Sequence, residues 1–214
     1  MENNPVRIHS NRSPNPAKQK NYTVICHSHR VFTIVTARPA VVRKWIHRIC
    51  NRHRHQLRHG RLVVGVGVQW AQWISNPPAT LQICVGHRCL IFQLEYADNS
   101  PTVLRLFLFD ARINFVGVWN YRDGDMLWDS RHRLEIRRLV DMRAVASDLR
   151  GCSRNISMER LADEILGMEG VEKEYVGRSD WDQEWLSEEQ VKYACVDAFL
   201  SFLMAIELQV WDWG

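Results

Sequence analysis

The 214-residue sequence lacks several features that mark common functional classes. It has no run of 18 or more apolar residues, and its first 20 residues lack the apolar centre of a secretory signal. We therefore expect a soluble protein without membrane contact, located in the cytoplasm, with a nuclear location left open. The sequence also has no internal repeat and no Gly-rich phosphate loop of the Walker or Rossmann type, which argues against solenoids and mononucleotide-binding folds.

Closely paired cysteines are also scarce. The six cysteines are scattered, and five lie within or beside apolar stretches, as reduced core cysteines do in cytosolic proteins. The tightest pair, Cys84 and Cys89, encloses His87 and flanks an expected hairpin turn. Because no second pair lies nearby, neither a zinc site nor a disulfide framework is favoured.

Acidic side chains are almost missing from the first 61 residues. This segment holds 13 Lys and Arg and one acid, Glu2, whereas residues 62–214 hold 15 basic and 23 acidic residues. Basic surfaces attract phosphate backbones because binding releases counterions. The densest part, "RHRHQLRHG" with the residue that follows it, supplies the candidate RNA-binding residues Arg52, Arg54, Arg58 and Arg61. A solvated loop without a partner is the alternative interpretation.

Composition and periodicity predict one α/β domain with a mixed central sheet flanked by helices. Residues 1–20, rich in Asn, Pro, Ser and basic groups, predict a disordered basic tail, and residues 21–210 the domain. We expect a hairpin over 22–36, a helix from 39, a three-stranded meander over 62–94, a helix over 101–109, strands over 114–119 and 137–143 with a helix from 121 between them, and helices over 157–166 and from 187, the last opened by the capping box "SEEQ".

This order of elements resembles that of the ribonuclease H-like 3'-5' exonucleases. "TLQICVGHRCLIFQL" is similar to the second and third strands of the Werner syndrome-type exonuclease domain, "FVGVWNYRDGDML" to its second motif and "SDWDQEWLSEEQVKYACVDAF" to its third. With "VVGVGVQW", these stretches further resemble a plant subgroup of exoribonucleases that interact with the RNA-induced silencing complex and clear its cleavage fragments. The resemblance covers about residues 20–210.

The resemblance implies a metal-dependent 3'-5' exonuclease of the DEDDy type. In such enzymes four carboxylates hold two Mg²⁺ or Mn²⁺ ions about 3.5–4 Å apart, and a Tyr orients the attacking water. The second-motif Asp falls on Asp123, and the third-motif Tyr and Asp fall on Tyr193 and Asp197. The first motif falls on Gly67 and Gln69, so both of its acids are absent. A conventional two-metal site within one subunit is therefore not expected, and a neighbouring subunit could supply the missing ligands.

Three functional interpretations stay open at this stage. The plant subgroup implies 3'-5' hydrolysis of single-stranded RNA by a homohexamer with active sites at subunit interfaces, and Argonaute or the silencing complex as a partner. The second interpretation is a catalytically silent RNA-binding or interaction module, in which Gly67 and Gln69 record lost catalysis. The third is activity on DNA in repair, which follows the wider family.

Several candidate residues also have structural explanations. Asp123 could cap a helix, Tyr193 could be a core aromatic, and Asp141 is expected to cap a helix or pair with a basic side chain. Asp197 is the strongest of the candidates, because an unpaired carboxylate in a largely apolar helix would be costly. Four of the nine tryptophans lie near the motifs, where they could stack on bases or pack in the core: Trp70, Trp73, Trp119 and Trp128.

Overall fold

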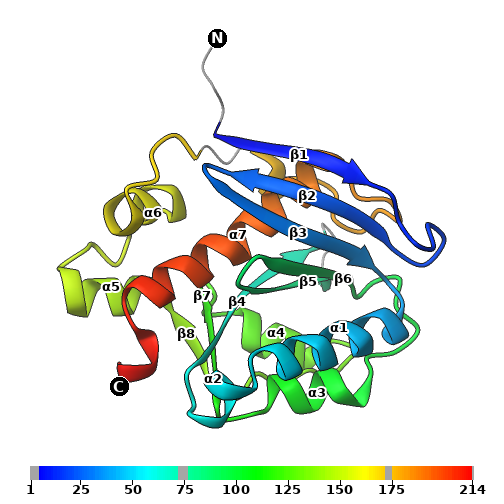
Figure 1. Ribbon diagram of the computed structural model, residues 1–214, viewed down its shortest axis with the longest axis horizontal. Coiled ribbons are helices and arrows are strands. Elements are labelled where there is room, and N and C mark those ends of the chain that lie inside the picture. Colours follow the sequence, from blue (N-terminus) through cyan, green and yellow to red (C-terminus); the bar gives the residue numbers. More distant parts are fainter. Residues whose placement is uncertain (1–4, 72–76, 172–174, 214) are drawn as a thin grey trace.

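The computed structural model describes residues 5–71, 77–171 and 175–213. Within these residues, eight strands form one sheet in the order β1-β2-β3-β6-β5-β4-β7-β8 (Figure 1). The strands are β1 (Val6–Asn11), β2 (Lys20–Cys26), β3 (His29–Thr36), β4 (Leu62–Trp70), β5 (Pro78–Val85), β6 (Arg88–Gln93), β7 (Ile113–Gly117) and β8 (Leu139–Asp141). The α-helices are α1 (Pro39–Arg52), α2 (Arg54–Arg58), α3 (Thr102–Leu108), α4 (Asp123–Asp129), α5 (Met142–Arg150), α6 (Met158–Leu166) and α7 (Glu188–Glu207), and the 3-10 helices are η1 (Tyr175–Arg178) and η2 (Val210–Asp212).

The sheet is mixed and carries helices on both faces. β2 and β3 form the predicted hairpin, and β4, β5 and β6 form the predicted antiparallel meander. β6 pairs in parallel with β3, and β7 pairs in parallel with both β4 and β8. Helices α1, α3 and α4 pack against one face, and α5, α6 and α7 pack against the other (Figure 1). The predicted fold class is therefore confirmed.

A glycine brings α7 close to β4. The side chains of a strand alternate between faces, and the valines at even positions of β4 join the core beneath α1 and α3. A Cβ at Gly65 would lie 1.8 Å from the carbonyl oxygen of Ala198, so any larger residue would push α7 away. This close crossing places Asp197, the residue before Ala198, beside the end of β4.

The prediction of a disordered tail over residues 1–20 is wrong for residues 6–11. They form β1, an edge strand antiparallel to β2, in which Val6 is buried. The connection to β2 is also tied down, because Asn21 N–H donates to Ser13 Oγ and Thr36 Oγ1 donates to the carbonyl of Lys18. Composition missed this strand because an edge strand is held by backbone pairing and needs few apolar residues.

Helices α6 and α7 form where the sequence predicts them, and α5 is an additional helix. The capping box of α7 is present, with Gln190 N–H donating to Ser187 Oγ and Ser187 N–H donating to Gln190 Oε1. Helix α5 was not predicted, because the apolar residues before it suggested a strand extending to residue 143. The strand ends instead at Asp141, whose side chain caps α5. Among the described residues, no helix is both long and apolar enough to cross a membrane.

Candidate active site

One pocket collects the residues of all three predicted motifs. It has a volume of about 220 Å³ and lies where the end of β4 meets α7 and the segment that follows β7. Its lining includes the five motif residues Gly67, Gln69, Asp123, Tyr193 and Asp197. The other lining residues are Val66, Val68, Trp70, Val118, Trp119, Met158 and Ser201. Residues from distant parts of the sequence therefore converge as the resemblance implies.

The third-motif carboxylate is hydrogen-bonded to the residue that replaces a first-motif acid. Gln69 Nε2 donates to Asp197 Oδ2 at 3.3 Å. Gln69 is buried, and its strand position points it towards α7. It thus presents an N–H donor to Asp197, which an ionised glutamate at this position could not do.

The space beside Gly67 is occupied by a side chain from the neighbouring strand. Gly67 pairs with Gln82 of β5, and a Cβ on Gly67 would lie 2.8 Å from Gln82 Oε1 and 3.8 Å from Asp197 Cβ. Gln82 is fully buried, and its Nε2 donates to Thr80 Oγ1 at 2.5 Å. Among the described residues, no hydrogen-bond partner reaches Gln82 Oε1. The amide therefore fills the place where an aspartate side chain at position 67 would begin.

Sequence reasoning missed Gln82. The signal available was a polar residue inside the largely apolar stretch "TLQICV", which belongs to β5, a strand whose eight residues are all buried. A buried amide normally has hydrogen-bond partners for both its oxygen and its nitrogen. Gln82 Oε1 is an exception to this rule, and it lies beside Gly67.

Asp123 is a buried carboxylate with a perturbed pKa. It is 8% exposed, and burial together with the nearby charge of Asp141 raises its pKa to about 7. The N-cap of α4 is Arg122, and Asp123 is the first helical residue, so the capping role considered for Asp123 is not the one it has. Its backbone N–H donates to the carbonyl of Asn120 at 3.0 Å, which fixes the start of α4 at the pocket.

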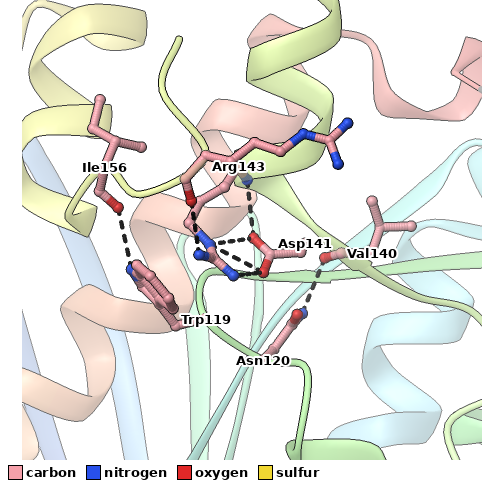
Figure 2. A network of polar contacts seen from close by, with 7 residues as sticks. Trp119, Asn120, Val140, Asp141, Arg143 and Ile156 are labelled. Carbon is pink, nitrogen blue, oxygen red and sulfur yellow. Dashed lines mark hydrogen bonds and ion pairs between the residues drawn. The ribbon is translucent and has the colours of Figure 1, made fainter.

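Asp141 has the structural role predicted for it. Its carboxylate accepts the backbone N–H of Arg143 as the cap of α5, and it pairs with the Arg143 guanidinium at 2.5 Å (Figure 2). Asn120 lies alongside this pair and donates to the carbonyl of Val140 at 3.0 Å (Figure 2). The segment after β7 is thereby attached to β8.

Tyr193 lies one turn before Asp197 on α7 and is half-buried. Its ring packs against Trp181 with centroids 5.9 Å apart, and its hydroxyl would lie 2.5 Å from a Cβ on Gly177. Burial, and to a lesser extent the charge of Glu159, raises the pKa of the Tyr193 hydroxyl. The phenol is therefore protonated at neutral pH and can orient a water molecule by hydrogen bonding, but it is not a base.

The predicted RNA-binding arginines do not lie in this pocket. All are exposed: Arg52 at the end of α1, Arg54 and Arg58 in α2, and Arg61 just before β4. These arginines lie near the start of β4, whereas the pocket lies at the end of β4. Seven residues of strand separate Leu62 from Gln69, which corresponds to roughly 23 Å at a rise of about 3.3 Å per residue. Any contact with nucleic acid at these arginines is thus separate from the candidate site.

The tryptophans near the motifs divide between the pocket and the surface. Trp70 and Trp119 line the pocket. Trp128 is 48% exposed, with the Arg133 guanidinium 5.9 Å from its ring centroid. Trp73 lies outside the described residues. Stacking on a base inside the pocket therefore concerns Trp70 and Trp119.

The residues of this one chain do not fit a centre of two divalent ions. Hard cations such as Mg²⁺ and Mn²⁺ prefer carboxylate oxygens, and the pocket offers two carboxylates, Asp123 and Asp197. In the described part of the chain, no group of three or more His, Cys, Asp or Glu residues is placed to hold a metal ion. The neighbouring amides of Gln69 and Gln82 add no negative charge.

Sequence comparison places this site in a known family. A family of 3'-5' exonucleases matches residues 76–210, which include Asp123, Tyr193 and Asp197 but begin after β4. The chain is 27% identical over 151 residues to the Mus musculus bifunctional 3'-5' exonuclease/ATP-dependent helicase WRN, covering 66% of this chain and 10% of that protein. It is 27% identical over 155 residues to the Homo sapiens exonuclease 3'-5' domain-containing protein 2, covering 68% of this chain and 25% of that protein. The chain thus corresponds to a minor part of each of these relatives.

Solved structures share the fold. The Aedes aegypti Nibbler EXO domain matches with a TM-score of 0.66 and 12% identity over 83% of this chain and 87% of that chain. Escherichia coli RNase D matches with a TM-score of 0.61 and 16% identity over 72% of this chain and 41% of that chain. These similarities confirm the ribonuclease H-like fold. With more than half of its residues matched, the chain belongs to the 3'-5' exonuclease family.

Proposed function

We propose that this protein is a 3'-5' exoribonuclease that takes the 3' end of single-stranded RNA into the pocket at the end of β4. The observation that carries the proposal is the convergence of Asp123, Tyr193 and Asp197 on that pocket. With further carboxylates supplied, Asp123 and Asp197 would hold a divalent ion that could bind the phosphodiester, and the phenol of Tyr193 would orient a water molecule.

RNA is the proposed substrate, with DNA as the alternative. Residues 3–94 contain no Asp or Glu, so β1 to β6, α1 and α2 carry positive charge that no acid of the same segment neutralises. Such a surface favours phosphate backbones of either kind. The choice of RNA, the clearing of RNA-silencing fragments and an association with Argonaute rest on the resemblance of the motif segments to the plant exoribonucleases.

A second copy of the chain is proposed to complete the site. Because Gly67 and Gln69 replace two acids, a centre that uses Mg²⁺ or Mn²⁺ requires carboxylates from elsewhere. A homo-oligomer, a hexamer by the same resemblance, would bring such groups to an interface next to the pocket. Hydrolysis would then depend on assembly, and RNA binding would not.

One observation favours a second candidate function, a catalytically silent RNA-binding module. The Gln69 amide pairs with Asp197, and Gln82 fills the space beside Gly67. A pocket with two fewer carboxylates repels a phosphodiester less when no metal is bound. The same substitutions that remove metal ligands would therefore favour binding of an intact strand.

One experiment separates the two functions. Purified protein is incubated with single-stranded RNA labelled at the 5' end or at the 3' end, with chelator, Mg²⁺ or Mn²⁺. A 5'-labelled ladder that shortens stepwise, with early release of the 3' label, identifies the exoribonuclease. RNA that is bound but unchanged identifies the silent module, and RNA that is neither bound nor shortened contradicts both. A DNA strand of the same sequence tests the sugar preference.

A further inference from the structure

Trp119 is held in an unusual backbone conformation at the edge of the candidate site. Its φ is +59°, in the left-handed region that bulky residues rarely adopt. Such a conformation persists only where the surrounding structure enforces it, and it is found most often at binding and active sites. The residue lies two positions after the end of β7 and lines the pocket together with Asp123.

Two contacts fix the indole ring of Trp119. Its Nε1 donates to the carbonyl of Ile156 at 3.1 Å, and the Arg143 guanidinium lies 3.4 Å from its ring centroid (Figure 2). Arg143 is itself immobilised, because it pairs with Asp141 and donates to the carbonyl of Arg154 at 2.8 Å. The ring is therefore positioned before any ligand arrives.

Core packing does not account for this arrangement. Trp119 is 46% exposed, whereas the tryptophans that belong to the core, such as Trp181 at 1%, are almost fully covered. The guanidinium lies over the ring, and the 46% of the residue that stays exposed is available to a ligand. Because Asp141 already neutralises Arg143, the exposed surface is an aromatic plane and not a cation site for phosphate.

We propose that Trp119 is a stacking platform for a nucleobase of the strand that enters the pocket. The inference rests on the proposed binding of single-stranded RNA and names the residue that holds a base beside the candidate carboxylates. A flat ring that is fixed on one side by a cation matches a planar base, and stacking accepts every base because each has a π-face. Trp119 acts in binding and takes no part in bond cleavage.

The test measures binding in chelator, where no strand is cut. The affinity of a 5'-fluorescent single-stranded RNA is compared for the parent, Trp119→Gly and Trp119→Phe. Glycine adopts a φ of +59° without strain, so Trp119→Gly keeps the backbone while removing the ring. We expect Trp119→Gly to bind about tenfold more weakly and Trp119→Phe to recover most of the loss. Trp185→Ala is the matched control, because Trp185 is exposed and also carries a cation, Lys20, on its ring, but lies outside the pocket lining.

A series of abasic strands locates the stacked base and separates stacking from a structural role. Each of the last four nucleotides is replaced in turn by an abasic one. At one position, base removal should weaken binding to the parent but not to Trp119→Gly, because the same interaction has already been removed. The inference would be overturned if Trp119→Gly and the parent bound RNA with equal affinity. It would also be overturned if base removal weakened binding to Trp119→Gly as much as binding to the parent at every position. A parent that binds RNA without cutting it in the labelled-strand assay refutes the nuclease proposal and leaves this inference standing.

Discussion

Gln69 and Asp197, which are 128 residues apart in the sequence, are joined by a hydrogen bond of 3.3 Å from the amide nitrogen to the carboxylate oxygen. The bond gives Asp197 a neutral partner in a partly apolar environment. Gln69 stands where the first motif has an acid. The pocket therefore has an N–H donor at this position in place of a carboxylate. Asp197 therefore has a polar partner when no metal is bound, and the two carboxylates that one chain brings to the pocket do not suffice for a two-ion mechanism.

Asp197→Asn tests whether the Asp197 carboxylate is required for catalysis. The substitution keeps the shape of the side chain and removes its charge, and the new amide can still present its oxygen to the Gln69 N–H. We expect nuclease activity to fall by about two orders of magnitude or more, as when a group that stabilises developing charge is lost. The thermal midpoint should change little. If the variant shortened RNA at the parental rate, Asp197 would have no catalytic role, and the assignment of Asp123 and Tyr193 to the active site would lose its support.

Restoring the first-motif acids should fail unless Gln82 is changed as well. In Gly67→Asp with Gln69→Glu, the new Cβ would meet Gln82 Oε1 at 2.8 Å, and two further carboxylates would face Asp197. We expect this double variant to be markedly less stable than the parent. Adding Gln82→Ser removes the obstructing amide and should recover part of the stability.

Metal then distinguishes the restored site from the parental one. An ion that binds only the folded state stabilises it by about 2.7 kcal/mol at a hundred times its dissociation constant. Addition of millimolar Mg²⁺ or Mn²⁺ should therefore raise the thermal midpoint of the triple variant more than that of the parent. An identical shift for both proteins would show that Gly67 and Gln69 do not limit metal binding.

The fold and the residues that meet at the candidate site could be predicted from the sequence. The side chain that fills the space beside Gly67 could not. Most elements follow from local patterns such as the capping box of α7, and the converging residues Asp123, Tyr193 and Asp197 were identified through the resemblance of their segments to the exonucleases. The role of Gln82 could not be predicted, because it depends on the cross-strand register that sets it opposite Gly67. The left-handed conformation of Trp119 is likewise invisible in the sequence, because the residue type is one that normally avoids it.

The raised pKa of Asp123 should appear as a pH dependence of stability. The folded protein holds this proton with a pKa of about 7, whereas an ordinary Asp side chain has a value of 3.8. Protonation therefore favours the folded state, and the free energy of unfolding should fall as the pH rises from about 4 to about 7. The upper limit of this contribution is about 4 kcal/mol. Asp123→Asn should lack it and be more stable than the parent at pH 8 in chelator. Parallel unfolding curves for both proteins from pH 5 to 8 would contradict the assignment.

The oligomeric state decides whether sites can be shared between subunits. One chain has a mass of 25.1 kDa, and the proposed assembly should give a several-fold larger mass by light scattering. Nuclease activity should disappear on dilution to the monomer, because the missing ligands leave with the second copy. A monomer that is fully active at every dilution would exclude shared sites.

The basic segment over residues 52–61 is predicted to contribute affinity and not catalysis. Its four arginines are exposed at the start of β4, away from the pocket, and residues 3–94 hold no acid to neutralise them. The variant replaces them by serine: Arg52, Arg54, Arg58 and Arg61. We expect weaker binding of all RNA sequences alike, and a salt dependence that is flatter by up to about three in the logarithmic slope. The rate of shortening at saturating RNA should be unchanged.

A matched control separates these arginines from general loss of positive charge. Arg154 and Arg160 are also exposed, but they are paired with Asp148 and Glu164, so their charges are largely balanced where they stand. Replacing both by serine should leave the salt slope close to that of the parent. If the control flattened the slope as much per charge as the basic segment does, binding would follow net charge alone. The surface at the start of β4 would then have no special role. If the RNA strand follows a defined path over this surface, the loss of affinity must depend on which arginines are replaced and not only on how many charges are removed.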